Sequence, residues 1–268
     1  MIYIADLNNK FFNSLLYLNE YYGVTQNPDT KDFMIIMKYY KFDLRDYISK
    51  GNDFYSIAWD KKLKILKHIA EGLDYLHSQD IIHRDLHSGN ILCENEDDVV
   101  ISDLGISKSA MESTDDDNKC YGIISYMAPE ILGGKKYTTA SDIYSFGMIM
   151  WEFMTGRMPF WDQINEYTEL KIKICDGLRP PIITNAPKNY VKLMQQCWNS
   201  DPIKRPGTKF ICDKLHEMLN NEVSNQTKII KLSEITPINY PKSKQLTSEE
   251  FTISSSSLGL GNYSECLL

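Results

Sequence analysis

Hydrophobic residues recur at helical spacing along much of the chain. Over residues 59–79 they return at steps of three and four, with lysines and acids between them, which predicts an amphipathic helix. Similar spacing predicts helices over about 163–176, 187–198 and 207–220. Residues 142–154 are apolar almost without interruption, which predicts a helix in the middle of a core.

Shorter apolar runs predict strands. Residues 33–40, FMIIMKYY, have the length and composition of a buried strand. Residues 91–92 and 99–101 flank an acidic turn and predict a small hairpin. Residues 107–120 are polar and mixed, which predicts a loop, and the chain from about 222 onward is rich in Ser and Thr without periodicity, which predicts a disordered tail.

Composition and charge narrow the class of protein. The chain has 268 residues with 43% hydrophobic and 24% charged residues, as ordinary globular proteins have. Its formal net charge of −7 makes nucleic acid an unexpected partner. The N-terminus lacks the pattern of a secretory signal, and the most apolar stretch, 143–154, is too short to insert across a membrane. The six cysteines show no metal-ligand spacing, so we expect reduced thiols and a cytoplasmic location.

One motif carries a specific chemistry. Residues 83–90 are HRDLHSGN, which matches H-R-D-L-x-x-x-N at every fixed position. A carboxylate that accepts a proton from an attacking hydroxyl, and an amide oxygen that reaches a metal ion on a phosphate chain, need this spacing on one rigid loop. Asp and Asn also form ordinary turns, so the motif alone leaves a structural alternative.

Two further motifs follow in order. Asp103-Leu104-Gly105 comes after the predicted hairpin, where Asp103 is suited to bind Mg²⁺. Ala128-Pro129-Glu130 closes the polar loop. With the apolar helix behind them, the three motifs resemble the eukaryotic protein kinase family, and most of all its tyrosine-kinase-like group.

The resemblance implies an α+β, two-lobed protein kinase fold with a reduced, β-rich N-terminal lobe and a complete, mainly helical C-terminal lobe. The implied boundaries are 1–37 for the partial N-terminal lobe, 38–220 for the hinge and C-terminal lobe, and 221–268 for the tail.

The resemblance also implies roles for individual residues. Asp85 would be the catalytic base, in a loop that also contributes Arg84, His87 and Asn90, while Asn90 and Asp103 would hold the metal. The remaining implied residues line the adenine site (Met37, Lys38, Tyr40 and Leu92) or support the structure (Asp142 under the catalytic loop, and Glu130 paired with Arg205).

The polar loop would be the activation segment. It offers hydroxyls for phosphorylation, among them Ser113, Thr114 and Tyr121, and a phosphate there could pair with Arg84. The acidic run 115–117 could supply negative charge permanently, or it could be an ordinary solvated run.

The N-terminal residues depart from the family pattern. No G-x-G-x-x-G is present, and Ala5 falls near the place of the strand lysine, with Lys10 outside a strand context. Ser14 stands where the helix glutamate is expected, and Glu20 is a weak substitute. Both the flap over the phosphates and the Lys–Glu pair are therefore in question.

The sequence leaves three functions open. The first is ATP- and Mg²⁺-dependent phosphorylation of protein hydroxyls. We favour Ser/Thr over Tyr by analogy with the tyrosine-kinase-like group, although His87 stands where serine/threonine kinases usually have lysine. The second is a pseudokinase that binds regulatory proteins, and the third is an incomplete version of an ordinary kinase. The expected partners are ATP and protein substrates, with no nucleic acid and no membrane insertion.

Overall fold

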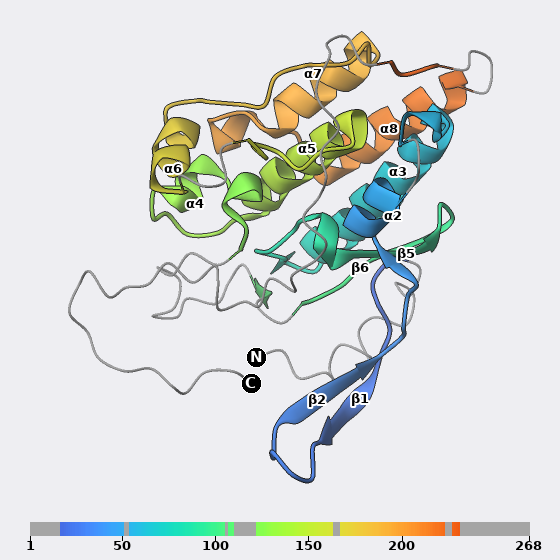
Figure 1. The fold of residues 1–268 in the computed structure, drawn as a ribbon. Helices are drawn as coiled ribbons and strands as arrows, with labels where there is room; N and C mark the ends of the chain where they lie inside the picture. Colours follow the sequence, from blue (N-terminus) through green and yellow to red (C-terminus); the bar gives the residue numbers. More distant parts are fainter. Residues whose placement is uncertain are drawn as a thin grey trace.

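The structure is a computed structural model, and it describes residues 17–50, 54–104, 107–109, 122–162, 167–222 and 227–230. A helical body carries a projecting two-stranded hairpin (Figure 1). The helices are α2 Leu44–Lys50, α3 Trp59–Ser78, α4 Pro129–Leu132, α5 Thr139–Thr155, α6 Tyr167–Cys175, α7 Lys188–Cys197 and α8 Thr208–Glu222. The strands are β1 Tyr21–Gln26, β2 Phe33–Met37, β3 Phe42–Asp43, β4 Ile81–Ile82, β5 Ile91–Asn95, β6 Asp98–Ile101 and β7 Lys108–Ser109.

The core lies between long helices. The apolar stripe of α3 is buried, as its spacing predicts, and α3 packs against α5 and α8. Every residue of α5 from Ser141 to Thr155 is buried. This helix begins earlier than the apolar run because Thr138 and Ser141 form a capping box, and it ends at Gly156, whose φ is 70°.

Three short strands lie beside this core. β5 and β6 pair antiparallel with Leu92 opposite Val100, which confirms the predicted hairpin, and β3 adds a third strand on β5. The predicted loop 107–120 is wrong in its first residues, because β7 pairs with β4 through Ile82 and Lys108. Residues 110–121 lie outside the described residues.

The hairpin of β1 and β2 corrects one expectation. Residues 33–37 do form a strand, with Ile35 opposite Val24, but that strand is exposed rather than buried. All five side chains of β2 are at least 38% exposed. FMIIM turns apolar side chains to both faces of the hairpin, and the hairpin extends away from the helical body (Figure 1). The strand β2 therefore has the apolar composition of a buried strand, but no layer of the described residues covers it.

The chain beyond α8 is held at Asn185. Its backbone N–H donates to the carbonyl of Ile230, and its side chain bonds to the backbone of Lys228 and Ile230. The side chain of Ile229 is 6% exposed. Residues 231–268 lie outside the described residues, so the predicted tail stays a prediction there.

No helix in the described ranges combines the length and the apolar character needed to cross a bilayer.

Candidate active site

The loop 83–90 is fixed from below by α5. The carboxylate of Asp142 accepts the backbone N–H groups of His83 at 2.9 Å and Arg84 at 3.0 Å. His77 of α3 lies 2.9 Å from the same carboxylate through Nε2. Asp142 is 1% exposed, so its charge is satisfied by these donors rather than by water. The structure thus places Asp142 where the sequence reasoning expects a support for this loop.

His83 connects the loop to the end of β6. Its Nδ1 accepts the N–H of Asp85 at 3.3 Å, so Nε2 carries the proton that is donated to the Ser102 carbonyl at 3.0 Å. Ser102 in turn donates its N–H and its hydroxyl to the carbonyl of Asn90. These bonds bring Asn90 beside the residue that precedes Asp103.

Asp85 and Asn90 contact each other. The Asn90 amide donates to the Asp85 carbonyl at 2.9 Å and approaches Asp85 Oδ2 at 3.4 Å. Burial raises the pKa of Asp85, but the nearby His87, His83 and Asn90 lower it more, so the net pKa lies below the ordinary value. Asp85 is therefore held as a carboxylate, the form that can accept a proton.

His87 lies on the other side of the same carboxylate. Its Nδ1 accepts the Gly89 N–H at 3.0 Å, which leaves the proton of the neutral ring on Nε2. That nitrogen is 3.6 Å from Asp85 Oδ1. A Cβ at Gly122 would lie 2.7 Å from Asp85 Oδ1, and the φ of Gly122 is 109°, so glycine alone allows this close approach.

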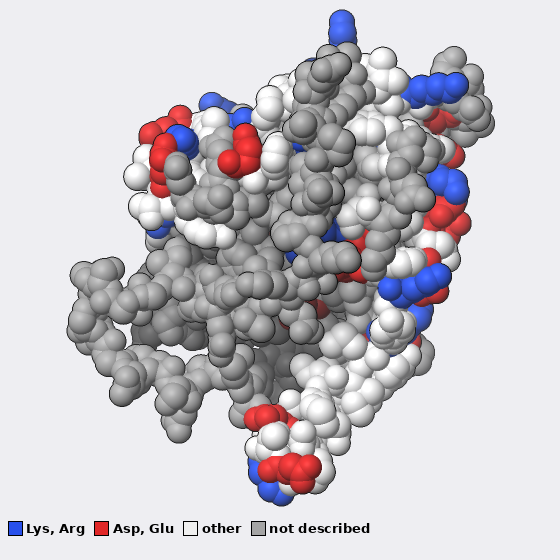
Figure 2. Space-filling model, viewed as in Figure 1, with Lys and Arg blue, Asp and Glu red and all other residues white. Residues whose placement is uncertain are grey.

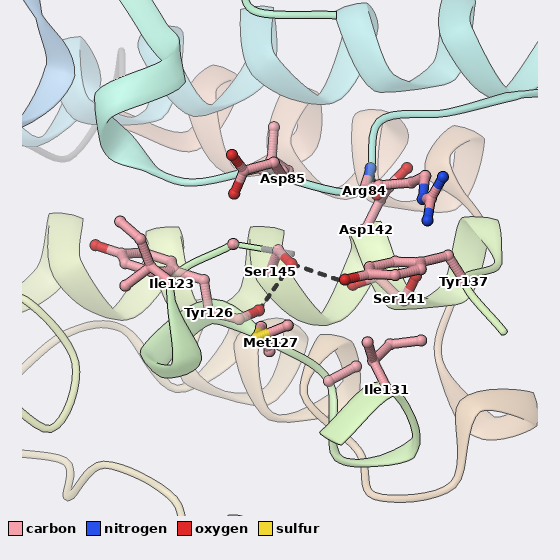
Figure 3. Close-up of a pocket in the computed structure, with 13 residues that line it drawn as sticks. Arg84, Asp85, Ile123, Tyr126, Met127, Ile131, Tyr137, Ser141, Asp142 and Ser145 are labelled. Atoms are coloured by element: carbon pink, nitrogen blue, oxygen red, sulfur yellow. Dashed lines mark hydrogen bonds between the residues drawn. The ribbon is translucent and has the colours of Figure 1, made fainter. Parts of the chain in front are cut away.

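A pocket opens between the loop 83–90 and the segment 122–128 (Figure 3). Arg84 and Asp85 lie on one side, with Ile123, Tyr126 and Met127 on the other. Ser145 of α5 holds the far wall, because its hydroxyl donates to the Tyr126 carbonyl at 2.8 Å. The pocket therefore borders the Asp85 carboxylate.

Glu130 and Arg205 form a buried pair, as the sequence reasoning expects. The guanidinium donates to both carboxylate oxygens, at 2.5 and 2.6 Å, and to the carbonyls of Ala140 and Asn199. The Arg205 side chain is 0% exposed and the Glu130 side chain is 7% exposed. This pair joins α4 to the segment before α8.

The residues expected at the adenine site lie along the hairpin base and β5. Met37 ends β2, and Lys38 forms an ion pair with Asp98 at 3.3 Å. Tyr40 is 8% exposed and donates to the same carboxylate at 3.4 Å. Leu92 is on β5, and none of the four lines the pocket of Figure 3.

Several expected residues lie outside the described residues. These are the acceptor candidates Ser113, Thr114 and Tyr121, and the N-terminal positions Ala5, Lys10 and Ser14. Glu20 is described, and its carbonyl accepts the N–H of Lys38 at 2.8 Å.

Sequence reasoning missed a polar cluster beneath the loop. Ser88, Tyr126 and Glu152 hydrogen bond to one another, and all are buried. The available signal was Glu152, the one acid in the apolar run of 143–154, because an acid in a core helix needs partners.

Comparison with known proteins identifies the fold. A family model described as protein tyrosine and serine/threonine kinase matches residues 13–215. The chain belongs to the protein kinase family. The mixed helical and stranded architecture of this kinase domain agrees with the expected α+β fold.

Relatives of the kinase domain carry serine/threonine kinase names. A protein of Acanthamoeba polyphaga mimivirus, named as a serine/threonine-protein kinase/receptor, is 38% identical over 168 residues, 62% of this chain and 10% of its own length. A Dictyostelium discoideum protein named as the serine/threonine-protein kinase roco8 is 34% identical over 205 residues, 72% of this chain and 11% of its own length. The chain thus spans about a tenth of the length of these relatives.

Proposed function

We propose that this kinase domain transfers the γ-phosphoryl group of ATP to serine or threonine hydroxyls of proteins. The observation that carries the proposal is the buried support that holds Asp85 against Asn90 at the mouth of a pocket. The names of the relatives favour Ser/Thr over Tyr, and the wording of the motifs favours the tyrosine-kinase-like group.

The proposed step is an in-line displacement. The substrate hydroxyl oxygen forms a bond to the γ-phosphorus, the bond from that phosphorus to the β–γ bridging oxygen breaks, and ADP leaves. The hydroxyl proton passes to the Asp85 carboxylate, whose lowered pKa keeps it unprotonated before the step. His87 and Arg84 lie next to Asp85 in the same loop, and we include both among the proposed catalytic residues.

The residues present fit a magnesium ion. Asn90 uses its amide N–H on Asp85, which turns its amide oxygen away from that carboxylate, and Asp103 adds an exposed carboxylate one residue after Ser102. Amide and carboxylate oxygens are the ligands that Mg²⁺ prefers, and the bound ion would neutralise charge on the phosphates. In the described residues no cluster of three His, Cys, Asp or Glu side chains offers a separate metal site. Met37, Lys38, Tyr40 and Leu92 remain the proposed adenine contacts.

The test is phosphate transfer to a generic protein substrate. Asp85→Asn should lower the rate by about 10²- to 10⁴-fold, because it removes the proton acceptor. Asp29→Asn, at an exposed carboxylate of the hairpin tip, is the matched control and should keep the wild-type rate. Equal rates from wild type and Asp85→Asn would refute Asp85 as the base.

A second candidate is a pseudokinase that binds protein partners, including regulatory proteins. It is favoured by the exposed apolar hairpin of β1 and β2. Titration with ATP, with and without Mg²⁺, separates the two. Metal-dependent ATP binding lost in Asp103→Asn supports the enzyme, and absence of binding in the wild type supports the pseudokinase. The cytoplasmic location stays a prediction that imaging of a tagged chain would test.

A further inference from the structure

The strand β2 has one open edge in the part of the chain that the structure describes. Its sheet consists of β1 and β2 alone, and the five residues of β2 are all apolar and exposed. The hairpin extends away from the helical body (Figure 1). A lone two-stranded hairpin is only marginally stable in water, and the backbone groups along an open edge can pair with another strand. The edge is therefore suited to receive a further strand.

The hydrogen bonds of the hairpin show which backbone groups face this edge. The Lys38 N–H and the Asp32 carbonyl both bond to residues on the β1 side of the hairpin, each at 2.8 Å. Backbone groups alternate in direction along an antiparallel strand. The N–H and carbonyl groups of Phe33, Ile35 and Met37 therefore point to the open edge.

The outer edge of β1 is less regular than that of β2. The pairing of the two strands shifts in register between Tyr21 and Gly23, and the φ of Gly23 is 155°. A bulge and a glycine disrupt the even spacing of backbone groups that an added strand needs. The sequence of β2, FMIIM, contains no glycine, proline or charged residue. Of the two edges, that of β2 is the better template.

The charges that flank β2 indicate what its partner is. Asp32 precedes the strand and Lys38 follows it, so the segment 32–38 has an acid at one end and a base at the other. When two copies of this segment pair antiparallel about a two-fold axis at Ile35, each Asp32 lies opposite the Lys38 of the other copy. Every apolar residue of β2 then lies opposite an apolar residue of the second copy. The segment is thus complementary to itself.

No neighbouring register keeps this match. Residues that face the open edge can hydrogen bond only with residues that also face it, so alternative registers differ by steps of two residues. A shift in one direction sets Asp32 against Ile36, and a shift in the other sets Lys38 against Met34. Each shift places a charge opposite an apolar side chain. The sequence therefore favours the register with Ile35 on the axis.

We propose that the edge of β2 is a dimerisation site that binds β2 of a second copy of this chain, giving a four-stranded antiparallel sheet in the order β1–β2–β2–β1. Asp32 and Lys38 form two symmetric ion pairs across the dimer. Lys38 also bonds to Asp98 at 3.3 Å within its own chain, and an ammonium group has donors for both carboxylates. Because each copy contributes little more than one strand, the dimer is weak and forms only at high protein concentration. The proposed phosphoryl transfer has no part in this inference.

Amide hydrogen exchange measured by NMR tests the edge directly. The wild type is followed from about 50 μM to about 1 mM, with sedimentation velocity reporting the oligomeric state. The amides of Phe33, Ile35 and Met37 should exchange about 10-fold more slowly at the highest concentration, because only the dimer supplies their hydrogen-bond acceptors. The Lys38 amide is the internal control and should change far less, because it already donates to Glu20 in each chain.

Three results would overturn the proposal. The first is a monomer throughout the concentration series. The second is protection of the three edge amides that does not depend on concentration, which would place a segment of the same chain on the edge. The third is a dimer whose edge amides stay unprotected, because another surface would then join the two copies.

Exchange of charges tests the register. Asp32→Lys and Lys38→Glu each set like charges against one another at both ends of the dimer, so each should weaken self-association by roughly 10-fold. An equimolar mixture of the two variants has opposite charges at both ends and should associate about as strongly as the wild type. Asp176→Lys makes the same change in charge at an exposed residue just after α6 and should dimerise like the wild type.

A mixture that associates no better than the separate variants would refute this register. If Lys38→Glu fails to fold because an acid then faces Asp98, Asp32→Lys and the wild-type exchange measurement decide the proposal. Weaker association of Asp32→Lys than of Asp176→Lys supports the pairing, and equal association overturns it.

Discussion

Asp142 shows how one buried side chain fixes a strained loop. Arg84 has a φ of 73°, a left-handed conformation that costs a residue with a side chain about 1 kcal/mol or more. The N–H of that same residue donates to Asp142, and its guanidinium lies over the Tyr137 ring at 4.6 Å. Asp103 also has a positive φ, of 57°. Strain therefore falls on both sides of the proposed phosphate site, where the surrounding contacts hold it.

The Glu130–Arg205 pair gives a prediction about stability. Arg205→Met leaves a buried carboxylate without its partner, so we expect a loss of about 3–5 kcal/mol in the free energy of unfolding. Urea unfolding measures it. The double variant Glu130→Gln, Arg205→Met should recover part of that loss because no charge is left buried, and a double variant as unstable as the single one would contradict the argument.

Glu152 gives a prediction about pH. Its pKa in the folded protein is raised above the ordinary 4.5, so the folded state binds this proton more tightly than the unfolded state does. Its contribution to stability is present below about pH 4.5 and is lost as the pH rises through the folded pKa. The wild type should therefore gain stability relative to Glu152→Gln as the pH is lowered from 8 to about 5.

Thermal unfolding at several pH values measures this difference. The control is Glu217→Gln, whose side chain is 60% exposed and pairs with Lys214 at the surface. A Tm difference between wild type and Glu152→Gln that is independent of pH would show that Glu152 titrates normally.

At the scale of elements, helical periodicity located α3, α6, α7 and α8 because each turns an apolar stripe to the core. Their ends depend on caps, and the start of α5 followed Thr138 rather than the first apolar residue. The sequence did not predict α2, because its seven residues are too few to show a helical period of hydrophobic positions. The burial of β2 was predicted wrongly because composition does not reveal whether another layer covers a strand.

In the candidate site too, sequence reasoning could predict contacts within one short segment but not contacts between distant segments. The motif residues Asp85 and Asn90 come together because a short local loop links them. The pairing of Ser88 and Tyr126 with Glu152 depends on side chains 26 to 64 positions apart, which no local pattern contains.

The crossing of α5 and the end of α7 gives a prediction at the element scale. A Cβ at Gly147 would lie 2.9 Å from the Cβ of Cys197 and 3.1 Å from the N of Trp198. Gly147→Ala should therefore push the helices apart and cost roughly 1–3 kcal/mol of unfolding free energy. At Gly207 a Cβ would meet nothing within 4 Å, so Gly207→Ala is the control and should leave the Tm nearly unchanged. A Gly147→Ala protein with the wild-type Tm would contradict the packing described.

At the scale of the molecule, the hairpin has a surface unlike that of the body. Figure 2 shows a largely uncharged surface along the hairpin, with acidic and basic side chains at its tip. The exposed side chains include Val24 at 51%, Phe33 at 55% and Ile35 at 49%. Exposed apolar strands promote association between chains.

Substitution of the facing pair Val24 and Ile35 tests this consequence. Val24→Thr with Ile35→Thr keeps β-branched side chains and removes apolar surface, so self-association should fall while the Tm changes little. Light scattering over a concentration series measures it. Scattering equal to that of the wild type would show that a different surface causes self-association.

The attachment of residues 228–230 to Asn185 has a practical consequence. It pins the chain beside α7 and α8, at the end of the molecule far from the β1–β2 hairpin (Figure 1). A fluorophore placed just after this point and a second one at the hairpin tip would span the long dimension of the domain. Energy transfer between the two dyes would then report any swing of the hairpin relative to the helices, with no label near the loop 83–90.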